Sequence, residues 1–107
     1  MIAGRDKPYR FTPAALRDLE EIWEFSAQRW SPTQADKYLT RMVSSIERIA
    51  ANPRMVRERR EYTPPVRIYR HESHVIIFTE QADHIAIIRV RHGGEDWAND
   101  PGTVGID

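Results

Sequence analysis

The chain has 107 residues, which suits one domain and is too short for two. Acidic and basic residues are balanced at 16 each, which excludes a uniformly basic nucleic-acid-binding protein and an acidic disordered chain. There is no cysteine, no apolar run of the roughly 20 residues that span a membrane, and no apolar stretch typical of a secretory signal. The sequence therefore predicts one cytoplasmic domain over residues 1–107, with loosely ordered ends at 1–7 and 97–107.

The N-terminal half predicts a short strand and then two helices. Residues 9–11 alternate between apolar and polar, as a short edge strand does. A threonine and a proline at 12–13 begin a helix that runs to about residue 30, and a serine and a proline at 31–32 begin a second helix that runs to about residue 52. Because the turn between the two helices is so short, they must lie antiparallel.

The C-terminal half predicts a small sheet. A loop over residues 53–65 carries several arginines, and after it the apolar period changes from 3.6 to 2. Residues 66–69, 75–78 and 84–91 are then three strands of an antiparallel meander. The predicted fold is a two-layer α+β domain, in which an antiparallel α-helical hairpin packs on a small, mainly antiparallel β-sheet in the order β-α-α-β-β-β.

Helical periodicity predicts which side chains form the core. On the first helix, the apolar stripe at 100° per residue is centred near Leu16, Trp23 and Trp30. Phe25 lies roughly 180° from Leu16, so it is either a lone exposed aromatic residue or part of an apolar patch with Ile22. The side chains predicted to be buried between helices and sheet are Leu16, Leu19, Trp23, Leu39, Met42, Ile46, Ile76 and Phe78.

Arginine dominates the basic residues, with 14 arginines against two lysines. Alternate residues of a strand share a face, so Arg89 and Arg91 are expected to point the same way. An arginine-lined face opposite the helices could hold a nucleic-acid backbone or an acidic protein segment, and the other interpretation is the ordinary polar face of a half-covered sheet. The basic residues expected on the strands and in the loop before them are Arg57, Arg59, Arg60, Arg67, Arg89, Arg91 and His92.

No catalytic, cofactor or metal motif stands out. His71 and His74 are three residues apart and have no evident third ligand. A phosphate-binding glycine-rich loop and a nucleophile elbow are both missing from the sequence. We therefore predict no catalytic residue, no cofactor and no metal.

Several blocks together resemble a known family over about residues 9–96. They are YRFTPAA at 9–15, DLEEIW at 18–23, the second helix with its stop at Asn52-Pro53, the set Arg57, Glu61, Pro64 and Arg67, and the strand residues His74-Val75-Ile76 and IIRVRHG at 87–93. In order and spacing they are similar to the ParE branch of the RelE/ParE toxins of type II toxin–antitoxin systems.

This resemblance implies a toxin that inhibits DNA gyrase and blocks replication unless a cognate ParD-type antitoxin holds it in a hetero-oligomer. Such a toxin is an enzyme inhibitor rather than an enzyme, and we expect no direct DNA binding by the toxin alone and no membrane partner. The alternatives are a RelE-like ribosome-dependent mRNA endoribonuclease and a non-toxic relative that only binds its antitoxin. No tyrosine follows Tyr69, and Gly94 and Glu95 stand where the family often has further arginines, which argues against the nuclease.

The resemblance also directs attention to particular side chains. We expect the basic side chains to contribute to toxicity or to contact antitoxin carboxylates, although Arg67 could equally be a structural residue paired with an acid such as Glu61. We expect the apolar patch of Ile22 and Phe25 to be covered by an antitoxin segment. The basic candidates are Arg57, Arg59, Arg67, Arg89 and His92.

Overall fold

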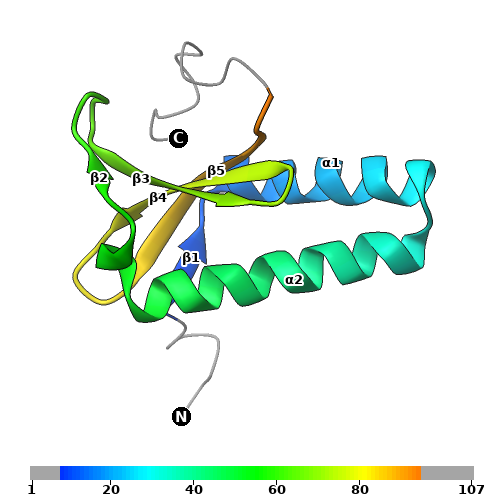
Figure 1. Cartoon of the computed structure of the whole chain (residues 1–107), viewed down its shortest axis with the longest axis horizontal. Helices are drawn as coiled ribbons and strands as arrows, with labels where there is room; N and C mark the ends of the chain where they lie inside the picture. Colours follow the sequence, from blue (N-terminus) through cyan, green and yellow to red (C-terminus); the bar gives the residue numbers. More distant parts are fainter. Residues whose placement is uncertain (1–7, 95–107) are drawn as a thin grey trace.

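The computed structural model describes residues 8–94, so the ends predicted to be loosely ordered lie outside the described residues. The elements in chain order are β1 (Tyr9–Phe11), α1 (Pro13–Arg29), α2 (Pro32–Ala51), a 3-10 turn η1 (Pro53–Met55), β2 (Glu58–Arg59), β3 (Val66–His71), β4 (His74–Glu80) and β5 (Ile85–His92). Figure 1 shows the two helices as an antiparallel hairpin against the sheet. The predicted two-layer α+β fold is confirmed.

The five strands form one sheet in the order β1-β5-β4-β3-β2. Strand β1 pairs in parallel with β5, with Tyr9 opposite Ile85 and Phe11 opposite Ile87, and the other pairs are antiparallel. The sequence left the position of the first strand open. It also missed β2, because two residues are too few to show alternation within the arginine-rich loop.

Both helices begin where their capping residues predict. The Thr12 hydroxyl accepts a hydrogen bond from the Ala15 amide at 3.1 Å, and the Ser31 hydroxyl accepts one from the Gln34 amide at 3.0 Å. A proline follows each cap at the first helical position, where its missing N–H leaves no hydrogen bond unmade. Because α2 begins at Pro32, soon after α1 ends at Arg29, the two helices form a tight hairpin.

The core between the layers contains most of the side chains predicted for it. Met42, Ile46, Ile76 and Phe78 are fully buried, in a cluster that also includes Ile85, Ile87 and Val90 of β5. Leu19, Leu39 and Val43 pack against this cluster while partly exposed, and Trp23 is also partly buried. The apolar stripe of α2 is therefore correctly predicted.

The stripe predicted for α1 is wrong in its direction. Leu16 is 50% exposed and Trp30 is 68% exposed, whereas Ala15, Asp18 and Ile22 are buried. The small alanine allows the helix to approach the sheet closely, and the larger apolar side chains of the stripe lie toward α2 or toward solvent. The apolar residues of α1 do recur with helical periodicity. However, α1 packs on both α2 and the sheet, and its apolar stripe does not face the sheet.

A bulge interrupts β5. Ile77 pairs with Arg89 while the next residue of β4, Phe78, pairs with Ile87, so Ile88 is an extra residue. The Ile88 carbonyl accepts a hydrogen bond from the Thr12 hydroxyl at 2.7 Å. The residue that caps α1 therefore also provides a hydrogen-bond partner for the carbonyl of the bulged residue in β5.

Candidate functional site

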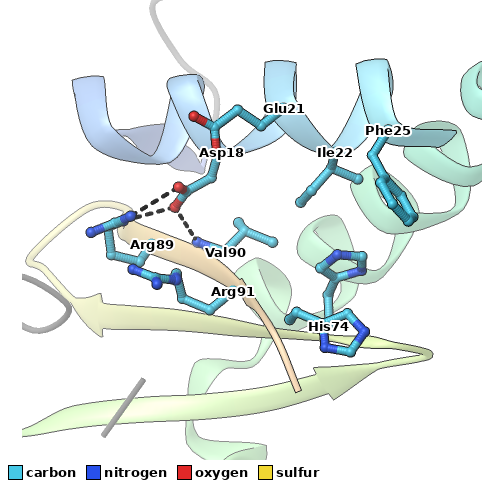
Figure 2. Close-up of a pocket in the computed structure, with 9 residues that line it drawn as sticks. Asp18, Glu21, Ile22, Phe25, His74, Arg89, Val90 and Arg91 are labelled. Atoms are coloured by element: carbon cyan, nitrogen blue, oxygen red, sulfur yellow. Dashed lines mark hydrogen bonds and ion pairs between the residues drawn. The ribbon is translucent and has the colours of Figure 1, made fainter. Parts of the chain in front are cut away.

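Two adjoining cavities lie where α1 passes the ends of β4 and β5. Phe25, His74 and His92 line both, so together they form one cleft. The first has a volume of about 300 Å³ and is lined by Asp18, Glu21, Ile22, Phe25, His74, Arg89, Val90, Arg91 and His92 (Figure 2). The second, of about 450 Å³, is lined by Phe25, Ser26, Arg29, Trp30, Gln34, Tyr38, Arg41, Glu72, Ser73, His74 and His92.

One end of the cleft is closed by a buried carboxylate. Strand β1 stops at Phe11, opposite Ile87, so β5 continues past it without another strand of the described residues on that side. The Asp18 carboxylate accepts the Val90 amide at 2.9 Å and both Nε and Nη2 of Arg89, at 2.8 and 3.0 Å. Figure 2 shows the three groups meeting between helix and strand. A two-pronged ion pair of this kind fixes α1 on β5.

Aromatic rings form the middle of the cleft. His74 and His92 are partners across β4 and β5, and their ring centroids lie 5.6 Å apart, edge to face. The Tyr38 hydroxyl of α2 lies 2.6 Å from Nδ1 of His74, and burial together with the nearby Glu72 carboxylate raises the pKa of Tyr38. The ring nitrogen Nδ1 of His92 accepts the Gly94 amide at 3.1 Å. These contacts give the rings fixed positions.

The turn between β3 and β4 is the remaining wall, and α2 holds it. Glu72 has a φ of 51°, and its carboxylate accepts the Nε of Arg41 at 2.9 Å, which lowers the pKa of Glu72. One residue earlier, Nδ1 of the buried His71 lies 2.9 Å from the Ser45 hydroxyl. The turn is therefore attached to α2 at two successive residues.

The structure places the predicted apolar patch differently from the prediction. Ile22 is only 8% exposed, since it packs into the core. Phe25 is 66% exposed but lies on the side of α1 that faces the sheet, and Figure 2 shows it pointing toward His74. Phe25 is exposed because the sheet ends below it, since the rings beneath belong to the start of β4 and the end of β5.

Two of the predicted arginines are not on an open face opposite the helices. Arg89 turns to Asp18 of α1. Arg67 shares the strand face of Tyr69, whose ring packs against the helix-side core, and its side chain is only 13% exposed. Its guanidinium donates to the Val56 carbonyl and to Glu80 at 3.3 Å, so its acidic partner is Glu80 rather than Glu61.

The remaining predicted basic residues are spread over the molecule. Arg59 of β2 donates to Glu61 at 2.7 Å, and Arg57 precedes that strand in an exposed position. Because β4 and β3 separate β5 from β2, Arg59 lies three strand spacings, or about 14 Å, from Arg89. The structure brings only Arg89 and His92 together, as lining residues of the cleft.

Sequence reasoning missed four other residues of the cleft. Tyr38 lies on the apolar stripe of the second helix, and the sequence shows of His74 only that it lacks a third ligand for a metal site. The sequence patterns described above predict no role for Glu21 or Arg29. A sequence signal for the last two does exist, since Glu21, Phe25 and Arg29 are spaced four residues apart on one helix.

Within residues 8–94, no helix is long and apolar enough to cross a membrane. In the same range, no group of three or more histidine, aspartate or glutamate side chains is arranged to hold a metal ion.

The fold and the matched sequence define the class of protein. The architecture superposes with a TM-score of 0.70 and 20% identity on a chain from the solved chromosomal ParDE TA system of P. aeruginosa, covering 81% of this chain and 96% of that one. A family model described as the ParE toxin of type II toxin-antitoxin system, parDE, matches residues 9–97.

Two similar proteins agree with this match. A protein named Toxin ParE1 from Mycobacterium tuberculosis is 38% identical over 85 residues, which are 78% of this chain and 87% of that protein. Another Toxin ParE1, from Caulobacter vibrioides, is 37% identical over 86 residues, or 80% and 88% of the two chains. The chain therefore belongs to the ParE toxin family, and the resemblance seen in the sequence is confirmed.

Proposed function

We propose that this toxin inhibits DNA gyrase in the cytoplasm and blocks replication unless a cognate ParD-type antitoxin neutralises it in a hetero-oligomer. The observation that carries the proposal is the family match over residues 9–97, together with 37–38% identity to two ParE1 toxins. The toxin acts as an inhibitor rather than as an enzyme, and it does not bind DNA by itself.

The state of the arginines supports inhibition over RNA cleavage. A nuclease stabilises the charge that develops on the scissile phosphate with cationic side chains aimed at it. Here Arg89 is paired with the buried Asp18, and Arg67 is held by Glu80 and the Val56 carbonyl. Neither guanidinium is free to turn toward a phosphate without breaking a structural contact.

Arg57, Arg59 and His92 remain the basic candidates for contacts with gyrase or with antitoxin carboxylates. Arg57 and His92 are both exposed, whereas Arg59 is partly buried, and Arg57 lies in the segment between η1 and β2. The ion pair of Arg59 with Glu61 is partly exposed, so an acidic partner could replace it at little cost.

A supercoiling assay with purified gyrase and relaxed plasmid tests this function. We expect the toxin to prevent supercoiling, and an equimolar amount of antitoxin to restore it. In cells, expression of the toxin should produce filaments and DNA damage. Cleaved mRNA with normal supercoiling would instead indicate the nuclease, and unchanged growth would indicate a non-toxic relative.

The matched variants for that assay are Arg57→Ala and Arg54→Ala. Both residues are exposed arginines three positions apart, Arg54 within η1 and Arg57 just after it, but Arg54 already donates to Glu80 at 3.4 Å. We expect Arg57→Ala to reduce inhibition of gyrase or binding of antitoxin, and Arg54→Ala to change neither. Equal activity of the two variants would remove Arg57 from the contact surface.

A further inference from the structure

Three exposed side chains form a row along α1 at the edge of the cleft. Glu21, Phe25 and Arg29 are spaced four residues apart, so they lie on one side of the helix. At 1.5 Å per residue, neighbours in this row are about 6 Å apart and its ends about 12 Å apart. Glu21 lines the first cavity, Arg29 lines the second, and Phe25 lies between them and lines both.

The two charges at the ends of the row have no ion-pair partner within residues 8–94. Among the other charges of the cleft, Asp18 is paired with Arg89 and Glu72 with Arg41, and Arg91 also lines the first cavity. Arg29 lies over the Trp30 ring at 5.3 Å, a cation–π contact that supplies no opposite charge. The row is therefore negative at one end, aromatic in the middle and positive at the other end.

A row with this order of charges is complementary to itself when reversed. If a second copy approaches with its α1 antiparallel, its Arg29 meets Glu21, its Phe25 meets Phe25, and its Glu21 meets Arg29. This is the property of a two-fold symmetric interface, in which residue i contacts j and j contacts i. The symmetry produces two ion pairs and one aromatic contact from only three residues of each copy.

The middle of the row is apolar and exposed, and a cavity beside it could hold a side chain of a partner. Phe25 and Trp30 are 66% and 68% exposed, which are large apolar surfaces to leave in water. The adjoining cavity of about 300 Å³ is large enough for one aromatic side chain, and its wall includes the rings of His74 and His92. An aromatic side chain at the centre of an interface, ringed by polar groups, is where binding energy concentrates.

We propose that a second copy of this chain binds along α1, with the two helices antiparallel and crossing at Phe25. The dimer brings Glu21 of each copy to Arg29 of the other and seats the Phe25 rings in the cleft. This self-association occurs in the free toxin, and it uses the same phenylalanine that we assign to antitoxin contact. Antitoxin binding therefore displaces the second copy.

Charge exchange tests the proposal on the purified toxin by analytical ultracentrifugation. We expect Glu21→Arg or Arg29→Glu alone to raise the dimer dissociation constant at least tenfold, because symmetry converts both ion pairs into repulsions. The double variant Glu21→Arg with Arg29→Glu restores opposite charges at both ends and should dimerise like the wild type. Glu20→Arg and Lys37→Glu change exposed charges away from the row and should have no effect.

Mixing the two single variants gives the sharpest readout. Glu21→Arg carries two positive ends and Arg29→Glu two negative ends, so each alone should be monomeric and the mixture should form a heterodimer. A wild-type toxin that stays monomeric up to millimolar concentration overturns the proposal. So does a dimer that the single variants leave intact, or a mixture that does not associate. A loss of antitoxin binding without any change in self-association would assign the row to the antitoxin instead.

Discussion

Asp18 shows how one side chain can replace a missing strand. Beyond Phe11, no strand within residues 8–94 pairs with that edge of β5, and an amide there would be buried without a partner. The Asp18 carboxylate accepts the Val90 amide and the Arg89 guanidinium at the same time. The family-like acidic block at 18–23 therefore has a structural purpose at its first residue.

Replacing Asp18 with asparagine should destabilise the fold strongly. The variant keeps the shape but removes the charge that balances Arg89, whose side chain is only 19% exposed. Removing one partner of a buried pair leaves the other charge uncompensated, which lowers the free energy of unfolding by about 3 kcal/mol. Urea unfolding measures this, with the exposed Asp36→Asn of α2 as the comparison. A difference below about 0.5 kcal/mol between the two variants would contradict this role for Asp18.

His71 should make stability depend on pH. Burial lowers its pKa; the Glu72 carboxylate acts in the opposite direction, and the charges of Arg41 and Arg48 lower the pKa further. The unfolded chain therefore binds a proton at a higher pH than the folded chain does. The free energy of unfolding is fully retained above about pH 6.5, falls as the pH drops below it, and levels off below the pKa of folded His71.

Denaturant unfolding between pH 7.5 and 5 measures that decline. We expect His71→Asn to flatten it, because the asparagine amide can still bond to Ser45 but does not titrate in this range. The control His84→Asn, at a histidine of the β4–β5 turn that bonds to Asp83, leaves His71 unchanged and should keep the decline. An equal decline in both variants would mean that other groups cause it.

At the scale of elements, helix boundaries were predictable because capping is local. A hydroxyl, a proline and the next amides are all the information that such a start needs. The direction of α1 was not predictable, because α1 packs on both the sheet and α2 and its own sequence does not say which neighbour takes the apolar stripe. The bulge at Ile88 was hidden for a related reason, since it depends on pairing with β4 and on Thr12, 76 residues earlier.

The same limit applies to the site. Alternation along an unbroken strand predicted an arginine face, but the pairing of Arg89 with Asp18 and of Arg67 with Glu80 is tertiary. Phe25 was found because its place on the helix conflicts with the apolar stripe. His74 could not be recognised, since its partners Tyr38 and His92 come from other elements.

A pair of alanine variants tests the corrected direction of α1. Ile46→Ala removes a fully buried side chain and should lower the free energy of unfolding by about 2–5 kcal/mol. Leu16→Ala removes a half-exposed one from a helix that favours alanine, and should change it by no more than about 0.5 kcal/mol. Thermal melts of both proteins are sufficient. A large decrease in the free energy of unfolding for Leu16→Ala would instead support the direction of the apolar stripe predicted from the sequence.

At the scale of the whole molecule, the helical hairpin extends past the sheet (Figure 1). Phe25 of α1 is 66% exposed. We expect Phe25→Ala to weaken antitoxin binding by at least about 1 kcal/mol, as the loss of an aromatic anchor does. Stability of the free toxin should barely change. Leu16→Ala is the control, since it removes a comparably exposed apolar group from the opposite side of α1. Calorimetric titration beside a melting curve measures both effects, and wild-type affinity of Phe25→Ala would exclude it from the interface.

The pairing of β1 with β5 has a consequence for synthesis of the chain. Thr12 leaves the ribosome 76 residues before Ile88, the residue whose carbonyl it binds. At about 5–20 residues per second, the first strand is made about 4–15 s before β5, the strand it pairs with. During that interval α1 has neither β5 beneath it nor the histidine that completes the cleft. The chain therefore cannot complete its fold until β5 has been translated.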